Sequence, residues 1–246
     1  MIKGLRCMVL SLVALGCALP SWASVVMTGT RVIYPGGAKE RSIQFTNPDD
    51  APSVLQIWID SGNADSTPET AEAPFVATPP VFRIEPKSGQ TARLIFTGKG
   101  LPQDRESVFF LNTIQIPALS TSHAERNKML LLLRNRIKLF YRPAGIAGDP
   151  ERAADTLSFS AVREGDDWKI TATNDSAFHI SLTDARITGA GEDIVLAPDM
   201  LAPKASFDWR IKSGADLLAA GSRISFSYVN DYGGDNKGEL PLAARR

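Results

Sequence analysis

The sequence predicts an all-β protein built from two β-sandwich domains. Short apolar stretches rich in β-branched and aromatic residues recur along the chain, and clusters of Gly, Pro, Asn and Asp separate them. No long segment carries apolar residues at the helical period of 3.6. A chain of 246 residues is long enough for two such domains of about 100–120 residues each.

Residues 1–23 have the features of a cleaved secretion signal. A basic start leads into an apolar stretch over Cys7–Leu19, which is too short to cross a bilayer as a helix. Small residues then occupy the two positions that a signal peptidase reads, so we expect cleavage after Ala23. A lipoprotein signal ending at Cys17 is the alternative, although the residues before that cysteine fit one poorly. Either signal predicts a protein that acts outside the cytoplasm.

The first domain is predicted over residues 24–145, where strand candidates alternate with turn signals. The candidates are Val25–Tyr34, Ser42–Asn47, Val54–Asp60, Val81–Glu85, Thr91–Thr97, Val108–Ile116 and Lys128–Tyr141. A series of strands punctuated in this way is typical of an immunoglobulin-like sandwich. Between the fourth candidate and the one before it, Thr78-Pro79-Pro80 suits a switch or kink, and we expect a cis-proline there. Pro and Gly at 143–150 then form a plausible linker.

The second domain is predicted over residues 146–246. Its strand candidates are Leu157–Glu164, Trp168–Asn174, Ile180–Thr188, Ile194–Leu196, Ser206–Ile211 and Arg223–Val229, with Glu239–Leu242 as a closing strand. At most a short helical turn is expected at Asp216–Ala220. This second series predicts a second β-sandwich in tandem with the first.

Composition excludes several classes of function. Both cysteines, Cys7 and Cys17, lie in the predicted signal, so the exported chain has no thiol chemistry and no cysteine-ligated metal. The 27 basic and 27 acidic residues are balanced, which is unlike the basic face of a nucleic-acid binder. We therefore expect no nucleic acid, no metal and no cofactor.

The segment Lys128–Tyr141 is unusual for a strand of an ordinary sandwich, because it is apolar on both faces. Met129 to Leu133 are five consecutive apolar residues, whereas one side of an antiparallel strand normally faces water. The segment is either a strand covered on both sides by its own protein, or an edge strand that receives a guest polypeptide. A guest strand would gain about 0.5–1.5 kcal/mol per main-chain hydrogen bond and about 1.5–3 kcal/mol per buried Leu or Met.

Basic residues follow within the same segment. Lys138 sits between Ile137 and Leu139, in a stretch that is expected to be largely buried. A buried lysine needs an anionic partner, and here that partner is either an internal carboxylate or the carboxylate of a ligand.

Several longer motifs lie in order along the chain, and together they are more specific than any one of them. They are Gly29–Tyr34, Ala77–Arg83, Leu101–Ser107 followed by Phe109 and Asn112, Ile137–Pro143 and Asn230–Gly234. These motifs resemble those of the PapD-like periplasmic pilus chaperones, and the resemblance covers essentially the whole exported chain. It implies two immunoglobulin-like domains in a boomerang arrangement, in the periplasm. It also implies donor-strand complementation, in which residues 128–141 complete pilus subunits, a tip adhesin included, before an outer-membrane usher accepts them.

The resemblance assigns roles to residues of the predicted cleft. Arg31 and Lys138 match two basic residues that grip the terminal carboxylate of a subunit, as charged donors suit a charged acceptor. Met129, Leu131 and Leu133 match the apolar side chains that enter the subunit.

Alternation in that segment poses a problem of register. Leu130 and Leu132 would then face the chaperone's own core, and in perfect alternation Lys138 would share their face. A bulge, or a cleft that wraps around the strand, would have to reconcile the two assignments.

Three further residues match a charged network between the domains: Glu106, Arg142 and Asp231. The short connection Pro117–Asn127 resembles the short-loop subclass of the family. Because apolar residues of the long strand would be exposed in the free protein, we also expect a self-capping homodimer.

Other functions find less support in the sequence. An exported hydrolase has only His123 and His179 to draw on, with no Gly-x-Ser-x-Gly elbow and no metal-binding histidine pattern. A pilin would be shorter and would carry an N-terminal donor arm. A carbohydrate-binding module would need exposed aromatics, whereas Trp58, Trp168 and Trp209 lie in predicted strands.

Overall fold

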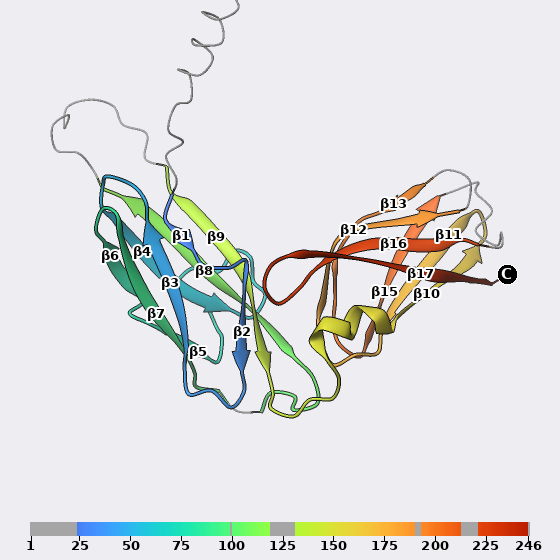
Figure 1. Ribbon diagram of the computed structural model, residues 1–246, viewed down its shortest axis with the longest axis horizontal. Coiled ribbons are helices and arrows are strands. Elements are labelled where there is room, and N and C mark those ends of the chain that lie inside the picture. Colours follow the sequence, from blue (N-terminus) through green and yellow to red (C-terminus); the bar gives the residue numbers. More distant parts are fainter. Residues whose placement is uncertain (1–23, 99, 119–130, 190–192, 213–220, 246) are drawn as a thin grey trace, which may run out of the picture.

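The chain folds into two β-sandwich domains that meet at a bend, as the boomerang prediction required (Figure 1). The computed structural model describes residues 24–98, 100–118, 131–189, 193–212 and 221–245. The expected signal segment and the connection over 119–130 lie outside the described residues. The described part contains no helix long and apolar enough to cross a membrane.

The first domain packs a four-stranded sheet against a five-stranded sheet. The four-stranded sheet has the order β1 (Val26–Met27), β3 (Arg41–Asn47), β7 (Ser88–Phe96), β5 (Phe75–Thr78). The five-stranded sheet has the order β2 (Arg31–Pro35), β9 (Leu133–Arg142), β8 (Ser107–Pro117), β4 (Ser53–Asp60), β6 (Val81–Ile84). Alternate side chains of both sheets bury one core, in which Tyr34, Leu94 and Leu139 have no exposed surface.

The second domain has β17 as the strand that joins its two layers. Its elements are β10 (Leu157–Glu164), β11 (Asp167–Asn174), β12 (Ile180–Thr188), β13 (Ile194–Leu196), β14 (Met200–Leu201), β15 (Ala205–Lys212), β16 (Arg223–Val229) and β17 (Asp235–Arg245). Residues 235–241 of β17 pair antiparallel with β16, and residues 242–245 pair parallel with β10. One continuous strand therefore links both layers over a core around Trp168 and Ile170.

The predicted strands are found with shifted ends and three additions. The expected strand Val25–Tyr34 is two strands, because β1 and β2 belong to different sheets and the chain turns between them at Gly29, where φ is +91°. Strands β5 and β14 were not predicted, and neither was the 3₁₀ helix over Pro150–Thr156. The expected cis bond is confirmed between Thr78 and Pro79.

The long strand begins later than predicted. We expected it over 128–141, whereas the described strand β9 runs from Leu133 to Arg142. Leu131 and Leu132 are described but are not paired in a sheet, and residues 128–130 lie outside the described residues. The expected helical turn at Asp216–Ala220 also lies outside them.

Candidate functional site

Strand β9 has two different halves. Strand β8 pairs with it along residues 133–141, whereas β2 pairs with it only along residues 138–142. Among the described residues, the stretch 133–137 therefore has a sheet neighbour on one side only. The backbone groups on its other side form an open edge that a further strand can pair with.

The register of β9 solves the alternation problem without a bulge. Pairing with β8 is continuous, and Ile137, Leu139 and Tyr141 face the core of the first domain. Leu133 has the same parity, so it lies on the core side at the end where the sandwich is open, and it is 41% exposed. Lys138 lies on the opposite face. The expectation that Leu132 packs into the protein's own core is wrong, because its side chain is 45% exposed.

A mostly apolar groove runs beside the open edge. It has a volume of about 510 Å³ and lies between the chain at β1 and the first half of β9. Val25 and Met27 line one side, and Leu133 and Ile137 line the other. Leu131, two residues before β9 begins, is 63% exposed. The groove and the open edge together offer apolar contact and backbone hydrogen bonds to one extended segment.

The open edge ends at a pair of cations. Arg31 begins β2 and is the register partner of Lys138 on β9. Arg31 Nη1 donates to the carbonyl oxygen of Val229 over 2.9 Å, and Lys138 Nζ donates to Ser181 Oγ over 3.0 Å. Both acceptors belong to the second domain, so the pair lies where the two domains meet.

Neither cation of this pair has a carboxylate partner among the described residues. No described Asp or Glu lies within 4.0 Å of either charged group, and Arg31 Nε is buried without a hydrogen-bond partner. Burial lowers the pKa of Lys138, and the nearby charge of Arg31 lowers it further while Asp199 opposes the shift. Burial also lowers the pKa of Arg31, against the charges of Asp231 and Glu106. The pair is therefore a site that an anion would stabilise.

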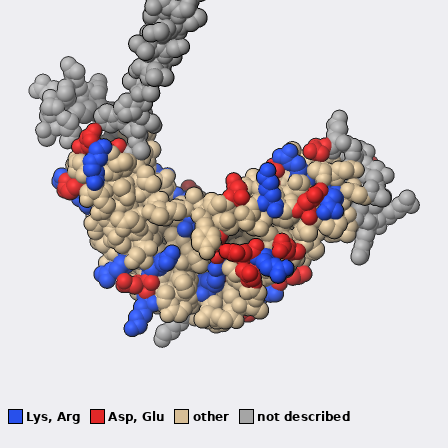
Figure 2. Space-filling view, in the orientation of Figure 1, with Lys and Arg blue, Asp and Glu red and all other residues tan. Residues whose placement is uncertain are grey.

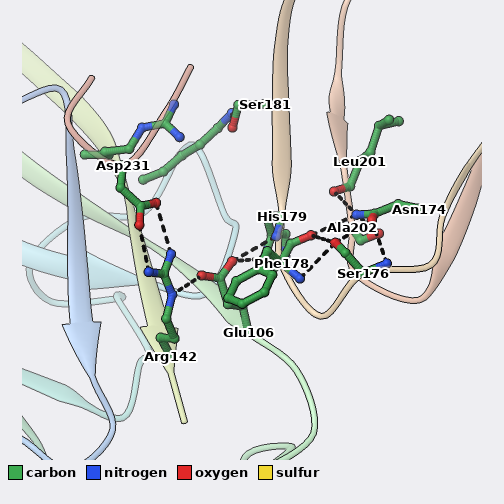
Figure 3. A network of polar contacts seen from close by, with 12 residues as sticks. Glu106, Arg142, Asn174, Ser176, Phe178, His179, Ser181, Leu201, Ala202 and Asp231 are labelled. Atoms are coloured by element: carbon green, nitrogen blue, oxygen red, sulfur yellow. Dashed lines mark hydrogen bonds and ion pairs between the residues drawn. The ribbon is translucent and has the colours of Figure 1, made fainter. Parts of the chain in front are cut away.

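A charged network connects the end of β9 to the second domain beside this pair (Figure 3). Arg142 Nε donates to Glu106 Oε1 over 2.7 Å, and its two Nη groups donate to the carboxylate of Asp231 over 2.7 and 3.0 Å. The second oxygen of Glu106 accepts from the backbone N–H of His179 over 2.8 Å. Burial acts to lower the pKa of Arg142, but the bonds to Asp231 and the charges of both carboxylates outweigh it and raise that pKa.

The structure brings together the residues of each group that the resemblance assigned, although they lie far apart in the sequence. Arg31 with Lys138 and Glu106 with Arg142 and Asp231 form two adjoining groups, and acidic and basic side chains lie side by side near the bend (Figure 2). Met129 lies outside the described residues.

Sequence reasoning missed the contacts that the second domain makes with the cations. Ser181 is a serine in a strand and Val229 contributes only its carbonyl oxygen, so neither carries a signal in the sequence. It also missed His179 as a partner of Glu106, since that residue was considered only as a candidate for catalysis. In the described part of the chain, no cluster of His, Cys, Asp or Glu could hold a metal ion.

Two family models match the chain and together cover most of it. Residues 24–147 match the family described as "Pili and flagellar-assembly chaperone, PapD N-terminal domain". Residues 152–240 match "Pili assembly chaperone PapD, C-terminal domain".

Individual relatives agree with these matches. The chaperone protein FimB/FhaD of Bordetella pertussis is 36% identical over 235 residues, which covers 92% of this chain and 93% of the relative. The chaperone protein HifB of Haemophilus influenzae is 37% identical over 229 residues, which covers 91% and 90%.

Solved structures of relatives share the fold. The crystal structure of the YadV chaperone matches with a TM-score of 0.73 at 32% identity, covering 89% of this chain and 99% of that one. A Salmonella enterica structure of the SafA pilin in complex with the SafB chaperone matches with a TM-score of 0.71 at 25% identity, covering 91% and 99%.

Proposed function

The chain belongs to the PapD-like family of pilus chaperones. We propose that it protects pilus subunits by pairing them with residues 133–137, the open half of β9. The protein is a fimbrial chaperone, of a family that consists of chaperones and not of enzymes. The mechanism that we assign to it is donor-strand complementation, in which the guest uses β9 as its missing strand.

One observation carries this proposal: the open edge of β9 ends at two cations that no described carboxylate contacts. A guest strand paired with residues 133–137 would meet Arg31 and Lys138 at the level where β2 begins. Its terminal carboxylate would supply the missing anion, and Arg31 Nε would gain an acceptor. This contact would set the register of the guest along β9, and thereby the side chains that enter the groove.

Apolar contacts would supply most of the remaining affinity. Leu131 and Leu133 are exposed in the free chain, and covering each fully would contribute about 1.5–3 kcal/mol. The role of Met129 in the same contact stays a prediction. The exposure of these leucines also supports a homodimer that covers them when no guest is bound.

We assign the network of Glu106, Arg142 and Asp231 to the orientation of the domains, with the boundary between them at residues 145 and 146. The network joins β9 to the second domain and leaves the open edge free. A partly buried network of this kind fixes geometry more reliably than it adds stability.

The remaining assignments rest on the family. We propose that residues 1–23 direct export to the periplasm and are removed there. The partners would be pilus subunits, including a tip adhesin, and an outer-membrane usher that receives them.

The test is to express the chaperone in the periplasm together with a pilus subunit encoded beside it, and to measure the recovered complex. Lys138→Ala should reduce recovery by about tenfold or more, because a charged hydrogen bond to the carboxylate contributes about 1.5–3 kcal/mol. Lys39→Ala, at an exposed position between β2 and β3, is the matched control, because it removes a lysine that does not lie on β9. Equal recovery with folded Lys138→Ala would contradict the carboxylate anchor.

A further inference from the structure

The open half of β9 needs support from its own protein, because it has one sheet neighbour and an exposed end. A strand held on one side frays more readily than a strand paired on both sides. If this edge frayed, guest binding would lose affinity, because the conformational entropy of the edge would be lost as well as that of the guest. The cleft-side face of the five-stranded sheet contains a polar network that acts at this place.

Asp60, the last residue of β4, is the centre of this network. It is 1% exposed, and its carboxylate accepts hydrogen bonds from two neighbouring strands and from the loop after β4. Arg136 on β9 donates to it from Nη2 over 2.7 Å and from Nε over 3.3 Å. Asn112 on β8 donates over 2.6 Å and Ser66 Oγ donates over 3.1 Å. The carboxylate is therefore fully paired and cannot move without releasing several partners.

The network reaches one step further along β9 through Asn112. This side chain is completely buried, and the bond to Asp60 turns its amide so that Oδ1 faces β9. Arg134 Nη2 donates to that oxygen over 2.8 Å and to the carbonyl oxygen of Ser66 over 3.2 Å. The two arginines of the open half thus connect to one buried carboxylate, one directly and one through an amide.

Aromatic rings hold both arginines flat against the sheet. The guanidinium of Arg136 lies 3.6 Å from the ring centroid of Phe110, and that of Arg134 lies 5.0 Å from the ring of Trp58. Trp58 in turn donates to Ser66 Oγ over 3.1 Å. Both arginines therefore extend across β8 toward β4, away from the open edge. Their contacts restrain the strand and leave its open edge accessible.

We propose that Asp60 is a positioning residue for strand donation: it holds Arg136, and Arg134 through Asn112, and thereby keeps the open half of β9 in place before a guest arrives. The inference rests on the proposed function. Asp60 touches no guest; it acts through the two arginines. The half of β9 that β2 already covers does not depend on it.

The test measures amide hydrogen exchange along β9 in the exported chain, residues 24–246. Asp60→Asn keeps the size of the side chain and removes its charge. Exchange over 133–137 should rise by about tenfold or more, while 138–142 should change little, since breaking one charged hydrogen bond releases that half alone. Ile43→Val, a buried change in the opposite sheet, is a control for general loss of stability.

Guest binding is measured on the same variants with a short fluorescent peptide of alternating valine and threonine that ends in a free carboxylate. Asp60→Asn should weaken binding by about tenfold, mainly by slowing association, whereas Ile43→Val should not. Asp60→Asn combined with Arg136→Gln should bind no more weakly than either change alone, because both break the same link. Arg134→Gln, at an exposed position, should give a smaller effect in the same direction, because Arg134 reaches Asp60 only through Asn112.

The outcomes separate this inference from the proposed function. Even exchange along the whole of β9, or unchanged peptide affinity in Asp60→Asn, would overturn the positioning role. Wild-type protein that binds neither the peptide nor its C-terminally amidated twin would overturn strand donation itself. Binding that ignores amidation would overturn the carboxylate anchor while leaving the role of Asp60 standing.

Discussion

The two halves of β9 belong to one strand but differ in burial and in pairing. From Leu139 to Tyr141 the side chains are buried, and β2 and β8 pair with the strand on both sides. From residue 133 to 137 the strand pairs on one side, and Leu133 is 41% exposed. The chain thus places a structural segment and the segment that we propose binds a guest in direct continuity. A strand anchored in the core at one end can present the other end in a defined position.

The largest test of this comparison removes one leucine from each half. Leu139→Ala should lower the free energy of unfolding by about 2–5 kcal/mol, because it opens a cavity among fully buried side chains. Leu133→Ala should cost about 0.5 kcal/mol or less, because its side chain already contacts water. Denaturant unfolding followed by tryptophan fluorescence measures both.

The same pair of variants should show the reverse order in guest binding. Leu133→Ala should weaken the capture of a subunit by about tenfold, whereas purified and folded Leu139→Ala should bind nearly as the wild type does. Equal stability losses for the two leucines would show that β9 has no separate binding half.

A second test concerns pH at the point where the halves meet. Burial and the neighbouring charge of Arg31 hold the pKa of Lys138 below its ordinary value of 10.5. Carboxylate binding needs the charged lysine, so guest affinity should be constant from neutral pH up to that lowered pKa and should fall as pH rises through it. The loss should be about tenfold or more, the value of a charged hydrogen bond. A titration of peptide affinity against pH, repeated on Lys138→Arg, would reveal an unrelated cause if both proteins gave the same curve.

The smallest test uses acid to protonate Asp60, the carboxylate that holds the arginines of the open half. Burial acts to raise the pKa of Asp60, but bonds from Arg136, Asn112 and Gly62 and the charge of Arg136 outweigh it, so this pKa lies below 3.8. A carboxyl whose pKa is lowered by folding stabilises the protein fully above its unfolded pKa. That contribution should disappear as pH falls through the lowered pKa in the folded protein.

Comparison with Asp60→Asn isolates this effect. The variant should show a flatter loss of stability with acid than the wild type, measured by urea unfolding between about pH 5 and 2. Identical acid profiles for the two proteins would mean that Asp60 does not contribute to the pH dependence of folding.

The sequence predicted the fold class well because most strands have both strong β patterns and clear turn signals. It missed β5, whose four residues directly precede Pro79, and it merged β1 with β2, since a switch between sheets leaves the apolar pattern uninterrupted. The 3₁₀ helix over Pro150–Thr156 is too short for a periodic pattern. A local sequence pattern predicts that a segment is a strand. Which sheet the strand joins depends on residues elsewhere in the chain.

The candidate site was predictable only where a motif carried it. Arg31 and Lys138 were assigned by resemblance, and the structure adds that both bind polar groups of the second domain. Asp60 was seen only as the end of a strand. Its partners come from β8, β9 and the loop after β4, and their spacing in the sequence does not predict that they lie together.

The turn between β16 and β17 has a mechanical consequence for the bend. Asp231 in this turn binds Arg142, and Val229 just before it accepts from Arg31. Gly233, with φ at +87°, approaches the first domain so closely that an added Cβ would lie 2.5 Å from Thr30 Oγ1. Two domains joined only by the linker could rotate about it. These additional contacts lie away from the linker and oppose such a rotation. We therefore expect the angle between the domains to change little when a guest contacts both of them.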